Sequence, residues 1–180
     1  MNLVIRPWRE HDAAALSQAI VESLDHLRPW MPWAADEPKS PAARLALIRG
    51  WERERLAGGD GFLGIWLDGQ VAGGCGLHRR IGPGGLELGY WVHPGFTRRG
   101  VATEAARQLC ERAFAGPSID RVEIHHDRAN AASGGVPPKL GFERVAERHR
   151  SPQAPGEEGV AWIWRLTRDT YEARASSSSA

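Results

Sequence analysis

The most constraining feature of this chain is a strand, a broken turn and a long helix that follow one another. The run from Leu86 to Val92 is typical of a strand, and Pro94-Gly95 ends it. After Gly100, apolar residues recur with a helical period from Val101 to Ala113. Arg98-Arg99-Gly100 precedes this helix, where free helix amides and two guanidinium groups would attract an anion. The unit predicts a phosphate-binding turn; the alternative is a solvated pair of surface arginines.

Length and charge limit the number of domains and the kinds of partner. The chain has 180 residues, enough for one domain with a sizeable core, and 42% of them are hydrophobic. Lysine and arginine total 23 against 22 aspartates and glutamates, so no overall field attracts nucleic acid or an anionic membrane. No stretch has an apolar signal core or the length to cross a bilayer, so we expect a cytoplasmic protein. Cys75 and Cys110 are expected to be buried thiols, and no ligand spacing predicts a metal site.

Helices and antiparallel strands are predicted before the central unit. Residues 3–6 predict a strand, and Asp12 is a candidate N-cap for a helix over residues 13–20. Ser40 and Pro41 begin a second helix, which two glycines end at residues 58 and 59. Residues 62–67 and 70–77 flank Asp68-Gly69, a two-residue hairpin turn. The N-terminal half therefore alternates between strands and helices.

After residue 114 the pattern favours strands again. Residues 121–125 alternate as a strand, and residues 131–140 predict a short helix that Pro137-Pro138 distorts. Residues 142–147 and 160–166 predict a final pair of strands. The tail over residues 173–180 is rich in serine and is expected to be disordered. We therefore expect a single domain over residues 1–172.

Three groups of residues resemble, in order, the signatures of one enzyme superfamily. The strand from Leu86 to Val92, followed by Arg98 to Ala105, resembles the acetyl-CoA signature of the GNAT superfamily. The resemblance is to its ribosomal-protein N-acetyltransferase (RimJ/RimL-like) branch. Asn130 to Ser133 with Lys139 to Phe142 resembles the second signature of that branch, and His26 to Trp33 resembles its loop between the first two helices. The correspondences extend over nearly the whole chain.

The resemblance implies both a fold and a cofactor. The fold would be α+β (mixed α/β), with a mostly antiparallel twisted sheet of about seven strands, one splayed parallel pair and about four flanking helices. The cofactor would be acetyl-CoA. Where the family commonly has Gln or Arg this chain has Thr97, a departure that leaves the implied binding by backbone amides in place. The implied cofactor contacts are Tyr90, Trp91, Val92, Arg98, Arg99, Gly100, Val101, Ala102, Thr103 and Asn130.

Acetylation of an amine requires a group that accepts a proton. Glu87, within the central strand, is the first candidate for a catalytic base, acting directly or through water. Because Glu87, Gly89 and Trp91 alternate onto one face, Glu87 either faces the acceptor or pairs with an arginine. His78 and His93 are alternative bases, because histidine titrates near neutral pH. A structural role at a strand end is the other interpretation of these two histidines.

Ser133 and Asn130 have two compatible interpretations. Ser133 is a catalytic candidate that donates a hydrogen bond or proton toward the sulfur, while the amide of Asn130 fixes the cofactor. Both residues could instead cap the helix that begins near Ala131. Trp30 and Trp33, on a proline-stiffened loop, are substrate-binding candidates that wall the acceptor pocket, or else form a lid that belongs to the core.

The residues leave three functions open. The resemblance favours an N-acetyltransferase that moves an acetyl group from acetyl-CoA to a primary amine, a protein N-terminal α-amine first. The second is the same chemistry on a small amine, such as an amino acid, an aminoacyl-nucleotide or an antibiotic. The third is a CoA-binding sensor without turnover, which would keep the turn at Arg98 to Thr103 and tolerate loss of Glu87 and Ser133. Neither nucleic acid nor membrane is an expected partner, and a homodimer stays open.

Overall fold

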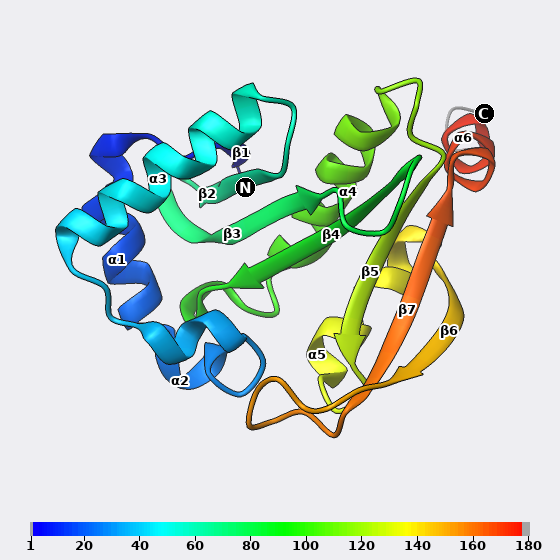
Figure 1. Cartoon of the computed structure of the whole chain (residues 1–180). Coiled ribbons are helices and arrows are strands. Elements are labelled where there is room, and N and C mark those ends of the chain that lie inside the picture. Colours follow the sequence, from blue (N-terminus) through cyan, green and yellow to red (C-terminus); the bar gives the residue numbers. More distant parts are fainter. Residues whose placement is uncertain (1, 178–180) are drawn as a thin grey trace.

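One seven-stranded sheet organises the chain (Figure 1). The computed structural model describes residues 2–177. The strand order is β1-β2-β3-β4-β5-β7-β6, and all neighbours are antiparallel except β4 and β5. The predicted α+β fold is therefore confirmed. The strands are β1 (Leu3–Pro7), β2 (Gly61–Leu67), β3 (Gln70–His78), β4 (Gly85–Val92), β5 (Arg121–Asp127), β6 (Glu143–His149) and β7 (Val160–Thr167).

Helices cover both faces of this sheet. Four of them have nine or more residues: α1 (Ala13–Val21), α3 (Pro41–Leu56), α4 (Val101–Phe114) and α6 (Arg168–Ser177). Two are single turns, α2 (Leu24–Leu27) and α5 (Ala131–Gly134). Short 3-10 helices are η1 (Glu10–Asp12), η2 (Pro32–Asp36), η3 (Pro94–Phe96) and η4 (Pro137–Leu140). Within residues 2–177, no helix has both the length and the apolar composition that a bilayer crossing requires.

Local chemistry explains several element boundaries. Asp68 and Gly69 have φ of 49° and 84°, as the predicted hairpin turn requires. Ser40 Oγ accepts a hydrogen bond from the amide of Ala43 at 3.2 Å, which caps α3 as expected. Asp12 precedes α1 but does not cap it, because its carboxylate binds the Arg6 guanidinium and the Arg9 amide.

The strands β4 and β5 pair only briefly. Their parallel register runs from Gly85 opposite Arg121 to Glu87 opposite Glu123, after which the two strands diverge (Figure 1). β4 continues to Val92 without a neighbour on that side. The predicted splayed parallel pair is confirmed, and it leaves a gap through the middle of the sheet.

A separate layer of side chains packs on each face of the sheet. α4 packs on β1, β3, β4 and β5, where Leu88, Leu109 and Val122 are at most 1% exposed. Burying a leucine of this kind stabilises the fold by roughly 1.5–3 kcal/mol. On the opposite face, α1 and α3 pack over β2 and β3, with Trp91 at the edge of their cluster. Among residues 2–177, the main contacts of α1 and α3 with the sheet are on β3 and β2.

The C-terminal segment differs from the prediction. Residues 173–177, expected in a disordered tail, continue α6, and residues 178–180 lie outside the described residues. α6 is anchored because Tyr171 stacks on Phe114 with ring centroids 4.8 Å apart. Arg168 also donates to the carbonyls of Phe114, Gly116 and Ile119. These contacts anchor the start of the helix to α4 and to the loop after it.

Candidate functional site

The turn before α4 has the features of an anion site. Gly100 is the N-cap with φ of 79°, and Arg98 is also left-handed with φ of 59°. The first hydrogen bond of the helix runs from the Glu104 amide to the Gly100 carbonyl at 2.9 Å, so the three amides between these residues have no intrahelical acceptor. A Cβ built on Gly100 would meet nothing within 4 Å, so the space before the turn is open. Together with Arg99, these groups fit a diphosphate.

Tyr90 and Ser133 lie together on the α4 side of the gap. The Tyr90 hydroxyl donates to the Ser133 carbonyl at 3.1 Å and lies 3.3 Å from Ser133 Oγ. Burial raises the pKa of Tyr90 to about 12, and the hydrogen bond with Ser133 offsets this only in part. Tyr90 therefore keeps its proton at neutral pH and can donate it in a hydrogen bond. The side chain of Asn130 accepts from the Ser133 amide at 3.1 Å, so the expected α5 cap is present.

Glu87 lies on the opposite face and is ion-paired. Arg80 donates to both of its carboxylate oxygens, Nε to Oε2 at 2.8 Å and Nη2 to Oε1 at 2.5 Å. The His125 Nδ1 lies 3.5 Å from Glu87 Oε2. Of the two alternatives drawn from the sequence, the structure contains the pairing of Glu87 with an arginine. Its role as a base stays a prediction.

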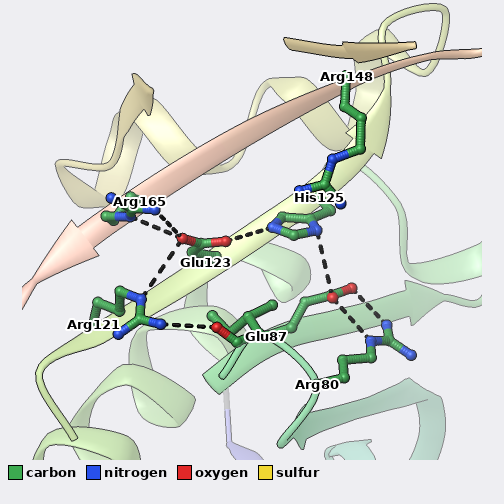
Figure 2. Close-up of a pocket in the computed structure, with 8 residues that line it drawn as sticks. Arg80, Glu87, Arg121, Glu123, His125, Arg148 and Arg165 are labelled. Carbon is green, nitrogen blue, oxygen red and sulfur yellow. Dashed lines mark hydrogen bonds and ion pairs between the residues drawn. The ribbon is translucent and has the colours of Figure 1, made fainter. Parts of the chain in front are cut away.

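Glu87 lines a polar pocket of about 400 Å³ (Figure 2). Glu123 lies at its centre, where it accepts from Arg165 at 2.6 Å and binds the His125 Nε2 at 2.6 Å. Burial alone would raise the pKa of Glu123, but the hydrogen bonds from His125 and Arg165 outweigh it and lower that pKa. Four arginines face two glutamates, so the lining is net positive. The lining residues are Arg80, Ile81, Glu87, Arg121, Glu123, His125, Arg148 and Arg165.

Sequence reasoning missed most of this pocket. Glu123 and His125 alternate on β5, so a shared face was visible, but their position beside Glu87 depends on the parallel register. Arg165 faces Glu123 only through the β5–β7 pairing. No local pattern carries this information.

The two candidate histidines have different surroundings. The His93 Nε2 lies 3.0 Å from Glu22 Oε2, and its Nδ1 accepts from the Gly95 amide at 3.1 Å. Both nitrogens of His93 are thus used in fixing the turn after β4. His78 is buried, and its Nδ1 lies 2.8 Å from Asp60 Oδ2. Of these two histidines, only His78 has a ring nitrogen without a hydrogen-bond partner among residues 2–177.

The two loop tryptophans, Trp30 and Trp33, lie in different surroundings. Trp33 lies on η2 with its ring centroid 6.3 Å from that of Trp91, and it is 37% exposed. Because Trp91 shares its face of β4 with Glu87 and Gly89, Trp33 lies on the same side of the sheet as Glu87. Trp30 instead packs beside Gly156 in the β6–β7 loop, whose amide donates to the Pro29 carbonyl at 2.9 Å. A wall of the acceptor pocket stays a prediction for both.

The cysteines do not contribute to this site. Cys75 and Cys110 are free and buried, as expected, and burial raises the pKa of each thiol to about 12. Both are therefore protonated and poorly nucleophilic at neutral pH. No group of three metal-ligating side chains is gathered anywhere in residues 2–177.

Comparison with known proteins decides the family. The model of the acetyltransferase (GNAT) domain family matches residues 2–143. The chain belongs to the GNAT acetyltransferase family. The family predicted from the sequence is confirmed, and the chain is an acetyltransferase.

Individual GNAT relatives agree with this assignment. YdaF of Bacillus subtilis (strain 168), a proposed ribosomal N-acetyltransferase, is 28% identical over 142 residues, 78% of either chain. The structure of RimL, the ribosomal L7/L12 α-N-protein acetyltransferase, in complex with coenzyme A has a TM-score of 0.85 at 19% identity and covers 94% of this chain and 96% of that chain. Mycobacterium smegmatis RimJ, in complex with a CoA disulfide, has a TM-score of 0.84 at 22% identity, covering 98% and 89%. These two structures support the GNAT fold, and the names are consistent with the RimJ/RimL-like branch.

Proposed function

We propose that the chain transfers the acetyl group of acetyl-CoA to a primary amine, with a protein N-terminal α-amine as the first candidate acceptor. The observation that carries the proposal is the gap between β4 and β5, which has an anion-binding turn on one side and a polar pocket on the other. RimL and RimJ are both represented as complexes with coenzyme A or its disulfide. The names of the relatives motivate the protein acceptor.

The cofactor residues divide into three groups by the chemistry that each offers. The amides of Val101, Ala102 and Thr103, with the guanidinium groups of Arg98 and Arg99, would hold the diphosphate. The backbone of Tyr90, Trp91 and Val92 has lost β5 as a neighbour and would pair with the amide-bearing arm like an added strand. Acetyl-CoA supplies an activated acetyl thioester. Asn130 would contribute through its amide nitrogen, because its oxygen is used in the α5 cap.

Tyr90→Phe is expected to lower kcat about tenfold and to change the KM for acetyl-CoA little. The Tyr90 hydroxyl, which lies next to that of Ser133, would stabilise the leaving sulfur, and this interaction is strongest when charge develops there. Steady-state kinetics of thiol release measures both constants. Tyr171→Phe is the matched control, because Tyr171 packs on Phe114 away from the gap. Equal effects of the two changes would remove Tyr90 from the reaction.

A panel of acceptors tests the proposed function. We expect thiol release from acetyl-CoA with peptides that begin with Ser, Ala or Met, and none when their α-amines are blocked. Release with small amines alone would overturn the protein acceptor. Binding of coenzyme A without release for any amine would favour the sensor interpretation, and absence of binding to folded protein would defeat the proposal as a whole.

The pocket lining favours one further candidate acceptor. Its arginine excess, with Arg148 lacking any ion pair among residues 2–177, suits an amine that carries an anionic group. An amino acid or an aminoacyl-nucleotide has such a group close to its amine. The same panel should therefore contain both compounds beside an uncharged amine of similar size.

A further inference from the structure

The acceptor side of the gap contains an aspartate–histidine pair that the cofactor site does not use. Asp60 precedes β2, and its Oδ2 lies 2.8 Å from the His78 Nδ1. Its Oδ1 accepts from the Arg79 amide at 2.7 Å, so the carboxylate is held in place at both oxygens. Phe62 meets the imidazole edge-on with ring centroids 5.0 Å apart. The ring of His78 is therefore fixed in orientation, with Nδ1 directed at Asp60.

The other ring nitrogen, Nε2, lies over two opposing glycines. Gly76 on β3 faces Gly89 on β4, and a Cβ would lie 3.1 Å from Nε2 on the first and 3.7 Å on the second. Since neither residue has a side chain, the imidazole reaches across β3 to the strand that borders the gap. Nε2 has no hydrogen-bond partner among residues 2–177, and it is not fully buried. This nitrogen is thus both unpaired and accessible.

We propose that His78, oriented by Asp60, takes the proton from the acceptor amine. The inference rests on the proposed function and names the base for that reaction. Asp60 accepts from Nδ1–H and so leaves the lone pair of the neutral ring on Nε2. The amine nitrogen forms its bond to the acetyl carbon and gives a proton to Nε2. The carbon–sulfur bond breaks with its electron pair on sulfur, which takes a proton from the Tyr90–Ser133 side or from water.

The other titratable groups near Gly89 are less suited to this step. Glu87 faces His78 in the strand register, but Arg80 engages both of its oxygens. His125 lies between two glutamates, Glu87 and Glu123. The charged groups around His78 are therefore Asp60, Glu87 and Arg80. With these partners Glu87 would position the neutral acceptor amine, which gives its proton to Nε2 as it attacks.

The test compares pH–rate profiles of four variants on a seryl peptide with a free α-amine. For His78→Gln we expect kcat/KM to fall about 100-fold, and the rise of the rate with pH beyond the one that the peptide α-amine itself causes to disappear. Asp60→Asn should lower the rate less and move the rise to a different pH. Glu87→Gln should lower the rate but keep the rise. His149→Gln, on the exposed face of β6, is the control and should match the wild type.

Two readouts separate this role from a structural one. A His78 that serves only to pack against Phe62 would lower the melting temperature of His78→Gln and leave the shape of the profile unchanged, which would overturn the proposal. Nitrogen-15 NMR of the ring needs no acceptor, and we expect Nε2 unprotonated and Nδ1 protonated in the neutral form. A neutral ring with its proton on Nε2 would also overturn the proposal. If no amine is turned over by the wild type, the proposed function fails, while NMR still decides whether Nε2 is available.

Discussion

Replacing Arg98 and Arg99 together by alanine is expected to weaken coenzyme A binding by about 100-fold or more. A charge-assisted hydrogen bond contributes roughly 1.5–3 kcal/mol, and about 1.4 kcal/mol corresponds to a factor of ten in affinity. Two such bonds to phosphate therefore account for at least this loss. The turn itself should persist, because Gly100 supplies the left-handed N-cap and Arg99 contacts Phe96 only through a cation–π interaction at 5.4 Å.

Calorimetry with coenzyme A and with pantetheine, which lacks the diphosphate, measures this effect. The double variant should bind pantetheine as the wild type does. Arg107→Ala is the matched control, because Arg107 lies on α4, which this turn precedes, and pairs with Glu104 and Glu111. An equal loss for coenzyme A and pantetheine would contradict the assignment of this turn to phosphate.

The parts of the fold that the sequence predicted are those with local causes. The hairpin at Asp68-Gly69 follows from two residues that tolerate positive φ, and the α3 start follows from Ser40 and its acceptance of the Ala43 amide. The α4 boundaries follow from helical periodicity after Gly100. Each of these signals lies within a few residues of the element that it specifies.

The surroundings of Glu87 and His78 could not be predicted in the same way. Asp60 and His78 are 18 residues apart, and their contact depends on the β2–β3 register. The position of Glu87 beside His125 depends on where β4 leaves β5. The sequence identified Glu87 and His78 as separate candidates, but only the assembled sheet distinguishes a carboxylate engaged by arginine from an imidazole with a free nitrogen.

The segment from Ala131 to Leu140 shows an intermediate case. A short, distorted helix was expected from Pro137-Pro138, and the chain forms α5 followed by the separate η4. Proline lacks the amide that would continue the α5 ladder, so the helix cannot extend through this pair. The consequence for the site is that Ser133 lies near the end of a single turn, where its hydroxyl reaches Tyr90.

Arg44→Ala is expected to lower the free energy of unfolding by about 3–5 kcal/mol. Arg44 Nη2 donates to Glu37 Oε2 at 2.6 Å, and the two side chains are only 3% and 1% exposed. Without Arg44, Glu37 would remain as a buried charge with no cationic partner, and its Oε1 already lacks a hydrogen bond among residues 2–177. Urea unfolding followed by tryptophan fluorescence measures the change.

Two further variants show whether the loss of folding stability comes from the unpaired charge of Glu37. Arg44→Met combined with Glu37→Gln should recover most of the stability, because neither side chain then carries a charge. Arg55→Ala breaks an exposed pair with Glu52 and should leave stability unchanged.

Because Glu37 follows η2 directly, the Arg44 contact also fixes the loop that carries Trp33. A folded Arg44→Ala protein should therefore have a higher KM for the amine and an unaltered affinity for coenzyme A; an unchanged KM would exclude Trp33 from the acceptor wall.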